Sequence, residues 1–148
     1  MRIVDQTYKL LGKISENSVT YLRISIGIVY FWFGFLKFFG GASPAEALAQ
    51  DTMFILFFGL IPKATLLLIL AIWESVIGLG FLTGKYLKFI IPLMLLQMFG
   101  TFTPLVFFPD LSFTQVPFAP SLEGQYIVKN LVLVSGALVV WRESAKER

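Results

Sequence analysis

An apolar run from Thr20 to Phe39 constrains the fold of this chain more than any other feature. A helix rises about 1.5 Å per residue, so a run of about twenty residues is long enough to cross the apolar core of a bilayer. Its small and polar residues recur at steps of three or four: Arg23, Gly27, Tyr30, Gly34 and Lys37. They share one helix face. Because lipid is a poor environment for such a face, we expect it to point inward, at other helices or a water-filled cavity.

The composition predicts an integral membrane protein. Hydrophobic residues make up 57% of the chain and charged residues 14%, and the mean hydropathy is +0.79, far from the usual mix of a soluble domain. A length of 148 residues accommodates four membrane helices with their connections, so we predict a single membrane domain over 1–148. We interpret the first run as a retained span, because it is longer than the core of a signal peptide and contains Arg23 and Lys37.

The apolar runs predict an all-α membrane protein with four transmembrane helices. The predicted spans are about 20–39, 64–83, 89–108 and 122–140. We expect Pro104 to kink the third span. Spans joined by short connections pack most simply as an antiparallel bundle. Its close-contact points would be Gly27, Gly34, Gly78, Gly100 and Gly136.

The connection between the first two spans predicts further helical structure. Ser43 to Glu46 has the pattern of a capping box with a proline at the first helical position, so a short helix should begin there. Asp51 or Thr52 is expected to cap a second piece over 53–61. That piece is apolar but too short to span, which favours an interfacial or re-entrant segment ending at Pro62.

The placement of basic residues predicts the orientation. Basic residues gather in three segments: residues 1–19, the turn between spans two and three, and the C-terminal tail. They are Arg2, Lys9, Lys13, Lys85, Lys88, Arg142, Lys146 and Arg148. We expect residues 1–19 to form an amphipathic lead-in at the membrane surface. The other two connections, with 110–121 read as a loop, hold only Lys63. The positive-inside rule then places both termini in the cytoplasm. We expect Arg23 to anchor anionic lipid and Trp141 to mark the membrane interface.

The residue types that are missing exclude several kinds of chemistry. The sequence has no cysteine and no histidine, which excludes disulfides, thiol redox chemistry, the usual ligation of haem and iron–sulfur centres, and most zinc sites. No metal site is predicted, and electron transfer would need a bound organic carrier. The net charge of +3 is weak support for nucleic-acid binding, and no such partner is expected.

Charged residues inside the spans define a candidate ligand-binding site. Lys37, Glu74 and Lys129 fall in the outer halves of their spans, where a charge facing lipid is costly, so we expect them to converge inside the bundle. Further polar residues would complete a network: Tyr30, Gln97, Tyr126 and Asn130. No nucleophile–base pair is recognisable, so we do not expect catalysis by this chain alone.

Two interpretations of this site stay open. In the first, Glu74 pairs with one lysine to set the helix register, and the other lysine extends to the outer headgroups. In the second, the residues line a pocket facing the outer side. Its positive excess would suit an organic anion or the carbonyl oxygens of a quinone, although Glu123 could cancel that excess.

The sequence resembles the DoxX-like membrane proteins from Arg23 to Val140. The resemblance rests on three patterns: Arg23-x3-Gly27-x6-Gly34-x2-Lys37, Glu74-x3-Gly78 and Glu123-Gly124-Gln125-Tyr126-x2-Lys129-Asn130. It implies a bacterial four-helix protein of the cytoplasmic membrane. Some members of that family are subunits of a thiosulfate:quinone oxidoreductase, and others are linked to oxidative-stress defence. Because this sequence has no cysteine, the resemblance does not extend to covalent sulfur chemistry.

Two functional hypotheses follow. The first is a quinone-associated accessory subunit, with quinone as candidate cofactor and a membrane or redox protein as partner. The second is a non-enzymatic membrane scaffold, or a carrier of a small anion or lipid. Proton-coupled transport would need Glu74 to titrate and would favour a homo-oligomer, because four spans are few for a transporter.

Overall fold

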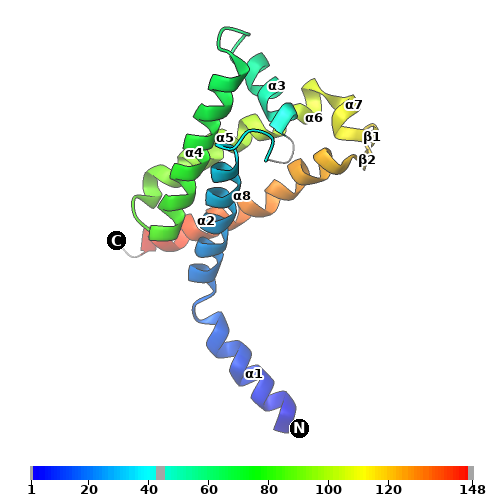
Figure 1. Ribbon diagram of the computed structural model, residues 1–148. Coiled ribbons are helices and arrows are strands. Elements are labelled where there is room, and N and C mark those ends of the chain that lie inside the picture. The colour runs from blue at the N-terminus through cyan, green and yellow to red at the C-terminus, as the bar shows by residue number, and fades with distance from the viewer. Residues whose placement is uncertain (1, 43–45, 147–148) are drawn as a thin grey trace.

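The computed structural model describes residues 2–42 and 46–146, and in this part the chain is all-helical apart from one short β-hairpin. The elements in order are α1 (Arg2–Ser15), α2 (Ser18–Leu36), α3 (Glu46–Leu56), α4 (Lys63–Thr83), α5 (Leu87–Phe102), α6 (Pro104–Phe107), α7 (Pro109–Ser112), β1 (Phe113–Gln115), β2 (Ala119–Pro120) and α8 (Leu122–Lys146). Figure 1 shows α1 projecting away from the remaining helices.

Within the described residues, four helices are long and apolar enough to cross a membrane, and each coincides with a predicted span. They are Ser18–Leu36, Lys63–Thr83, Leu87–Phe107 and Leu122–Lys146. The ends differ from prediction at two places. The first helix stops at Leu36, with Lys37 as its C-cap, and the last continues beyond Val140 to Lys146.

The third long helix is interrupted at Thr103, where Pro104 is predicted to kink it. Proline has no N–H to donate to the carbonyl four residues earlier. Here that carbonyl belongs to Gly100, and it accepts hydrogen bonds from the backbone N–H of Thr103 at 3.2 Å and from its hydroxyl at 2.7 Å. The backbone carbonyl is thus satisfied although the helix is broken.

Helices α2 and α4 form the closest helix pair in the molecule. The predicted inward face of α2 is confirmed, because Gly27, Tyr30 and Gly34 are buried. A Cβ added at Gly34 would lie 2.8 Å from the Cβ of Glu74, and one added at Gly78 would collide with the backbone of Phe31. The glycines therefore allow the two backbones to approach closely, as small residues do between packed helices.

The remaining glycine predictions have mixed outcomes. At Gly136 of α8 a Cβ would lie 3.1 Å from side-chain atoms of Leu22 and Ile26, so this is a close contact with α2. At Gly100 it would meet only a methyl carbon of Leu56 at 3.5 Å, an ordinary contact.

The hydrophobic core joins all four long helices at the end where the α4–α5 turn and the end of α8 lie. Its buried members are Ile26, Tyr30, Ile77, Phe81, Ile90, Ile91, Met94, Met98, Ala137 and Val140. Toward the other end, the first half of α8 runs away from α2 (Figure 1). Helix α3 lies at that open end and contacts α4.

The prediction of two helical pieces between the first spans is wrong, because α3 runs unbroken from Glu46 to Leu56. Thr52 does not cap a helix there. Its buried hydroxyl donates to the carbonyl of Leu48 at 2.6 Å, inside the helix. The predicted cap at Ser43 lies outside the described residues, while the carboxylate of Glu46 accepts a 3.0 Å hydrogen bond from the N–H of Gly41.

The predicted loop at 110–121 also differs, because it contains α7 and an antiparallel hairpin of β1 and β2. The hairpin closes against the start of α8. The carbonyl of Ser112 accepts a 2.9 Å hydrogen bond from the N–H of Ser121 and lies where a Cβ at Gly124 would stand. Only glycine fits at this point of α8.

Candidate functional site

A cavity of about 840 Å³ lies among α2, α3, α4, α5 and α8, within the usual size range of small-molecule sites. Most of its wall is apolar. Every residue predicted to bind a ligand lines it: Tyr30, Lys37, Glu74, Gln97, Tyr126, Lys129 and Asn130. The cavity therefore brings together residues from α2, α4, α5 and α8.

Lys37 and Glu74 form an ion pair at one side of this cavity. The Nζ of Lys37 lies 2.5 Å from Oε2 of Glu74, and the two side chains are only 10% and 12% exposed. Lys37 also donates to the carbonyl of Phe33 at 3.3 Å, so its positive charge sits at the C-terminal end of α2, where the helix dipole favours a cation. The close approach at Gly34 puts the two side chains within reach of each other.

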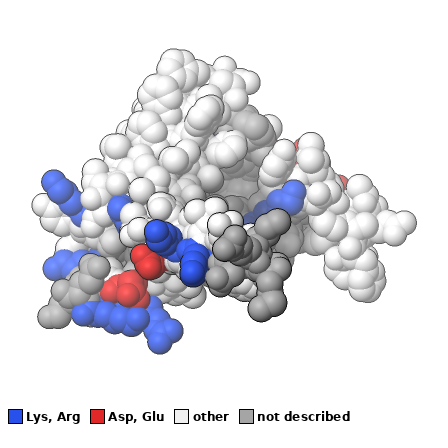
Figure 2. Space-filling model, turned by 90° about the horizontal axis from the view of Figure 1, so that it is seen from below, with Lys and Arg blue, Asp and Glu red and all other residues white. Residues whose placement is uncertain are grey.

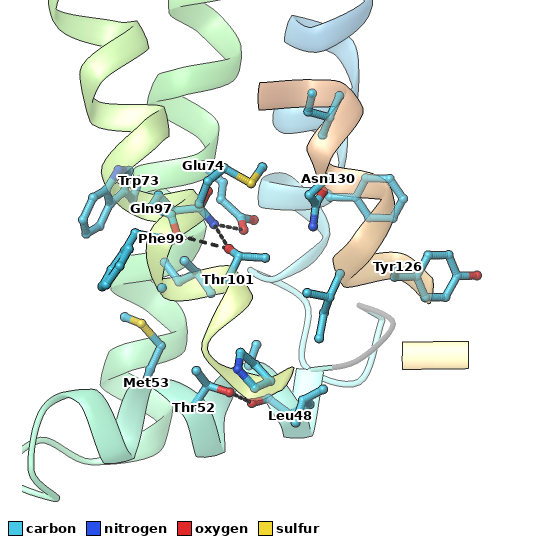
Figure 3. A pocket seen from close by; sticks show the side chains of 18 of the residues that line it. Leu48, Thr52, Met53, Trp73, Glu74, Gln97, Phe99, Thr101, Tyr126 and Asn130 are labelled. Carbon is cyan, nitrogen blue, oxygen red and sulfur yellow. Dashed lines mark hydrogen bonds between the residues drawn. The ribbon is translucent and has the colours of Figure 1, made fainter. Parts of the chain in front are cut away.

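A chain of hydrogen bonds continues from this pair to α5. The hydroxyl of Tyr30 donates to Oε1 of Gln97 at 2.9 Å, and Nε2 of Gln97 donates to Oε1 of Glu74 at 3.3 Å. The same Nε2 lies 3.1 Å from the hydroxyl of Thr101, which donates to the Gln97 carbonyl. The dashed lines in Figure 3 include the two bonds made by this Nε2. Both carboxylate oxygens of Glu74 thus have partners.

The residues predicted on α8 are placed differently. Lys129 is exposed, with its Nζ 5.7 Å from the ring centroid of Tyr126, and within the described part of the chain no ion pair joins it to Glu74. The three charges predicted to converge are therefore a close pair plus a lysine at the rim. Figure 3 shows Tyr126 pointing away from Glu74 and Gln97.

The side-chain amide of Asn130 faces the cavity without a hydrogen-bond partner among the described residues. It lines the cavity, and Figure 3 shows it on α8 across from Glu74 and Gln97. In residues 2–42 and 46–146 its side chain has no hydrogen-bond partner. An amide offers both donors and an acceptor, so Asn130 is available to a bound molecule.

Arg23 and Trp141 lie away from the cavity. The guanidinium of Arg23 donates to the carbonyls of Phe81 and Leu82, the latter at 3.0 Å, and so satisfies the C-terminal end of α4. Trp141 is exposed near the end of α8. Their roles as membrane anchors stay predictions, and the helix-capping role of Arg23 is an addition from the structure.

Sequence reasoning missed much of the apolar wall. The inner face of α3 contributes Leu48, Thr52, Met53 and Leu56. The sequence predicts a short helix and an interfacial or re-entrant piece in this region, and none of its residues is among the ligand-binding candidates. Trp73 of α4 also lines the cavity, and its indole N–H donates to the carbonyl of Leu93 at 3.3 Å. The sequence places Thr101 on the same face of the third span as Gln97, one turn later, but Thr101 is not among the ligand-binding candidates.

The polar side chains that line the cavity can form hydrogen bonds and ion pairs. Among the described residues no group of acidic side chains could hold a metal ion. Comparison with known proteins gives no match, whether to a protein-family model, to a curated protein or to a solved structure. The resemblance to DoxX-like proteins therefore stays a prediction, and the functional argument rests on the cavity and its residues.

Proposed function

We propose that this chain is a multi-pass protein of the bacterial cytoplasmic membrane, of the DoxX-like type, that holds a quinone as an accessory subunit of a membrane redox or oxidative-stress system. The observation that supports this most is the cavity of about 840 Å³, with a largely apolar wall and a polar network on one side. Quinones have a polar ring and, in membranes, an apolar tail, and this wall offers both environments.

The distribution of side chains supports a membrane setting with both termini in the cytoplasm. Large apolar residues are exposed on all four long helices, among them Trp32, Leu68, Phe99 and Val132. Figure 2 shows most of the basic side chains of the lower face gathered in its left half, the side on which the C-terminus lies in Figure 1. The exposed residues Lys85, Lys88, Arg142 and Lys146 belong to that end, and a cytoplasmic end is expected to be basic.

The polar side has hydrogen-bonding capacity left for carbonyl oxygens. An ammonium has three N–H donors, and Lys37 uses donors on Glu74 and Phe33. Its remaining N–H and the amide of Asn130 are both suited to the carbonyl oxygens of a quinone ring. The sequence has no cysteine or histidine to ligate a redox metal. In this proposal a partner protein delivers the electrons, which defines the accessory role.

Mass spectrometry of molecules that co-purify with the protein from its own membrane tests this proposal. We expect a quinone bound to the wild type and to the control Ser135→Ala, which alters an exposed residue of α8 outside the cavity. Asn130→Ala should retain much less, because the free amide is lost while the Lys37–Glu74 pair is untouched. Wild-type protein without quinone at any stoichiometry would overturn the proposal.

The alternative is a non-enzymatic scaffold or carrier, and one observation favours it. Lys37, Glu74, Gln97 and Tyr30 already satisfy one another, so the network could serve only to set helix register. The double variant Lys37→Met/Glu74→Leu separates the two. A scaffold should keep its fold and its function in cells, whereas loss of function with normal folding would exclude the scaffold role.

A further inference from the structure

We infer that the ligand of this cavity is an uncharged amphiphile with an apolar chain, and that it enters sideways from the bilayer through an opening between α2 and α8. This inference rests on the proposed function and narrows it in two respects. It excludes a small anion as the ligand, and it assigns the route of entry.

The charges around the cavity favour an uncharged head group. Lys37 and Lys129 line it together with Glu74 and Glu123, so the formal charges of the lining cancel. The most buried of these charges, Lys37, is neutralised at 2.5 Å by Glu74. An anion would have to compete with that carboxylate and lose its own hydration, which is costly in an apolar setting.

The polar groups of the cavity that have no hydrogen-bond partner among the described residues include N–H donors, which can bind the oxygen of an uncharged head group. The amide of Asn130 has no hydrogen-bond partner in the described part of the chain and lies across the cavity from the network. Lys37 also lines the cavity and donates to Glu74 and Phe33, which leaves one of its three N–H groups. These donors suit carbonyl or hydroxyl oxygens. A purely hydrocarbon ligand would leave them unsatisfied, and this also favours an amphiphile.

The route of entry follows from how α2 and α8 cross. They are in contact where Gly136 meets Leu22 and Ile26. On the side of this contact toward the start of α8, the two helices diverge (Figure 1), and residues of both helices line the cavity while being exposed at the surface. These are Val29 and Phe33 of α2, and Tyr126, Lys129 and Val132 of α8.

The rim of this opening is apolar except for the ammonium of Lys129 and the hydroxyl of Tyr126. Val29, Phe33 and Val132 are 37%, 45% and 71% exposed and still line the cavity, so they are continuous with the apolar surface of the long helices. Such a rim disfavours a water-soluble ligand and suits a hydrocarbon chain that extends into lipid. The head group would then face Asn130, with the chain lying across Val132.

Tryptophan fluorescence can report the binding. The chain has 3 tryptophans, of which Trp73 lines the cavity. Replacing Trp32 and Trp141 by Phe leaves Trp73 as the sole emitter in full-length protein, reconstituted into phosphatidylcholine nanodiscs. The probes are a benzoquinone with a decyl chain and the same ring with a methyl group in its place. Both quench a nearby indole when bound.

A matched pair of α8 variants tests the opening. Val132→Phe enlarges a residue at the rim. Val139→Phe makes the same change about two turns further along, at an exposed residue that does not line the cavity. We expect Val132→Phe to weaken binding of the decyl probe by about tenfold, a typical effect of overfilling a packed site. Binding of the methyl probe, and of either probe to Val139→Phe, should be unchanged.

Each other outcome has a defined meaning. If neither probe quenches Trp73, the proposed function fails and this inference fails with it. If both probes bind but Val132→Phe affects them equally or not at all, the quinone-type site stands and the sideways entry is overturned. Displacement of the decyl probe by inorganic phosphate would overturn the uncharged head group.

Discussion

The two faces of α2 differ sharply in how they pack. Toward α4 the helix is in close contact along most of its length, because Gly27, Gly34 and Gly78 leave no side chain between the backbones. Toward α8 a close contact lies at Gly136, and residues of both helices line the cavity. One helix thus belongs to a closely packed pair and to the wall of an open site.

This difference shows how a small membrane-type protein can hold a polar site in place. The α2–α4 contact positions Lys37 and Glu74 so that they pair across a fixed interface. The α8 side contributes Asn130 from across a space that the chain itself does not fill. We therefore expect substitutions in the α2–α4 contact to change stability and substitutions on the α8 side of the cavity to change ligand binding. The following variants test the first of these expectations.

The largest effect is expected from removing one partner of the buried ion pair. Lys37→Met leaves the carboxylate of Glu74 buried without its cation, which should lower the free energy of unfolding by about 3–5 kcal/mol. Adding Glu74→Leu should recover most of this loss, since no uncompensated charge then remains. Equilibrium unfolding in detergent measures both. A double variant as unstable as the sum of its single changes would contradict the coupling.

A Cβ inside the α2–α4 contact should have the next largest effect. In Gly78→Ala the new methyl group collides with the backbone of Phe31, and overpacking of this kind should cost about 3 kcal/mol. Gly12→Ala is the matched control, because nothing lies within 4 Å of its Cβ in α1. It should be neutral or stabilising by up to about 1 kcal/mol. Equal unfolding free energies in the two variants would mean that α2 and α4 are not in close contact.

A smaller effect is expected from a single hydrogen bond of the network. Tyr30→Phe removes the 2.9 Å bond to Gln97 and should lower stability by about 1 kcal/mol. Tyr21→Phe changes an exposed tyrosine of the same helix and should have little effect. Thermal unfolding of the pair in one detergent gives the comparison. If Tyr30→Phe matched Tyr21→Phe, the network would contribute nothing to stability.

The smallest effect should come from a second ion pair of the same length. Lys63 lies 2.5 Å from Asp51, but these side chains are 47% and 39% exposed. Lys63→Met should therefore change the free energy of unfolding by less than about 1 kcal/mol. Raising the salt concentration should reduce even this difference. A loss comparable to that of Lys37→Met would show that burial does not distinguish the two pairs.

The features of this protein that depend on local periodicity could be predicted from its sequence. A run of about twenty apolar residues limits a segment to a long helix. The recurrence of Gly27, Tyr30 and Gly34 identifies the face that becomes buried. The same reasoning named Glu74, Gln97 and Asn130, which line the cavity, because a charged or amide side chain within such a helix is expected to face inward. Lys129 departs from this expectation, since it is exposed.

Which of these residues contact one another depends on the tertiary structure. Nothing local to Lys37 or Lys129 says which lysine reaches Glu74. That choice follows from the close approach of α2 to α4 and from the divergence of α8, which depends on contacts of Gly136 with α2 and of Gly124 with Ser112. The placement of α3 as a wall of the cavity is likewise non-local. Helix periodicity specifies a face, whereas the crossing of two helices is set by side chains far apart in the chain.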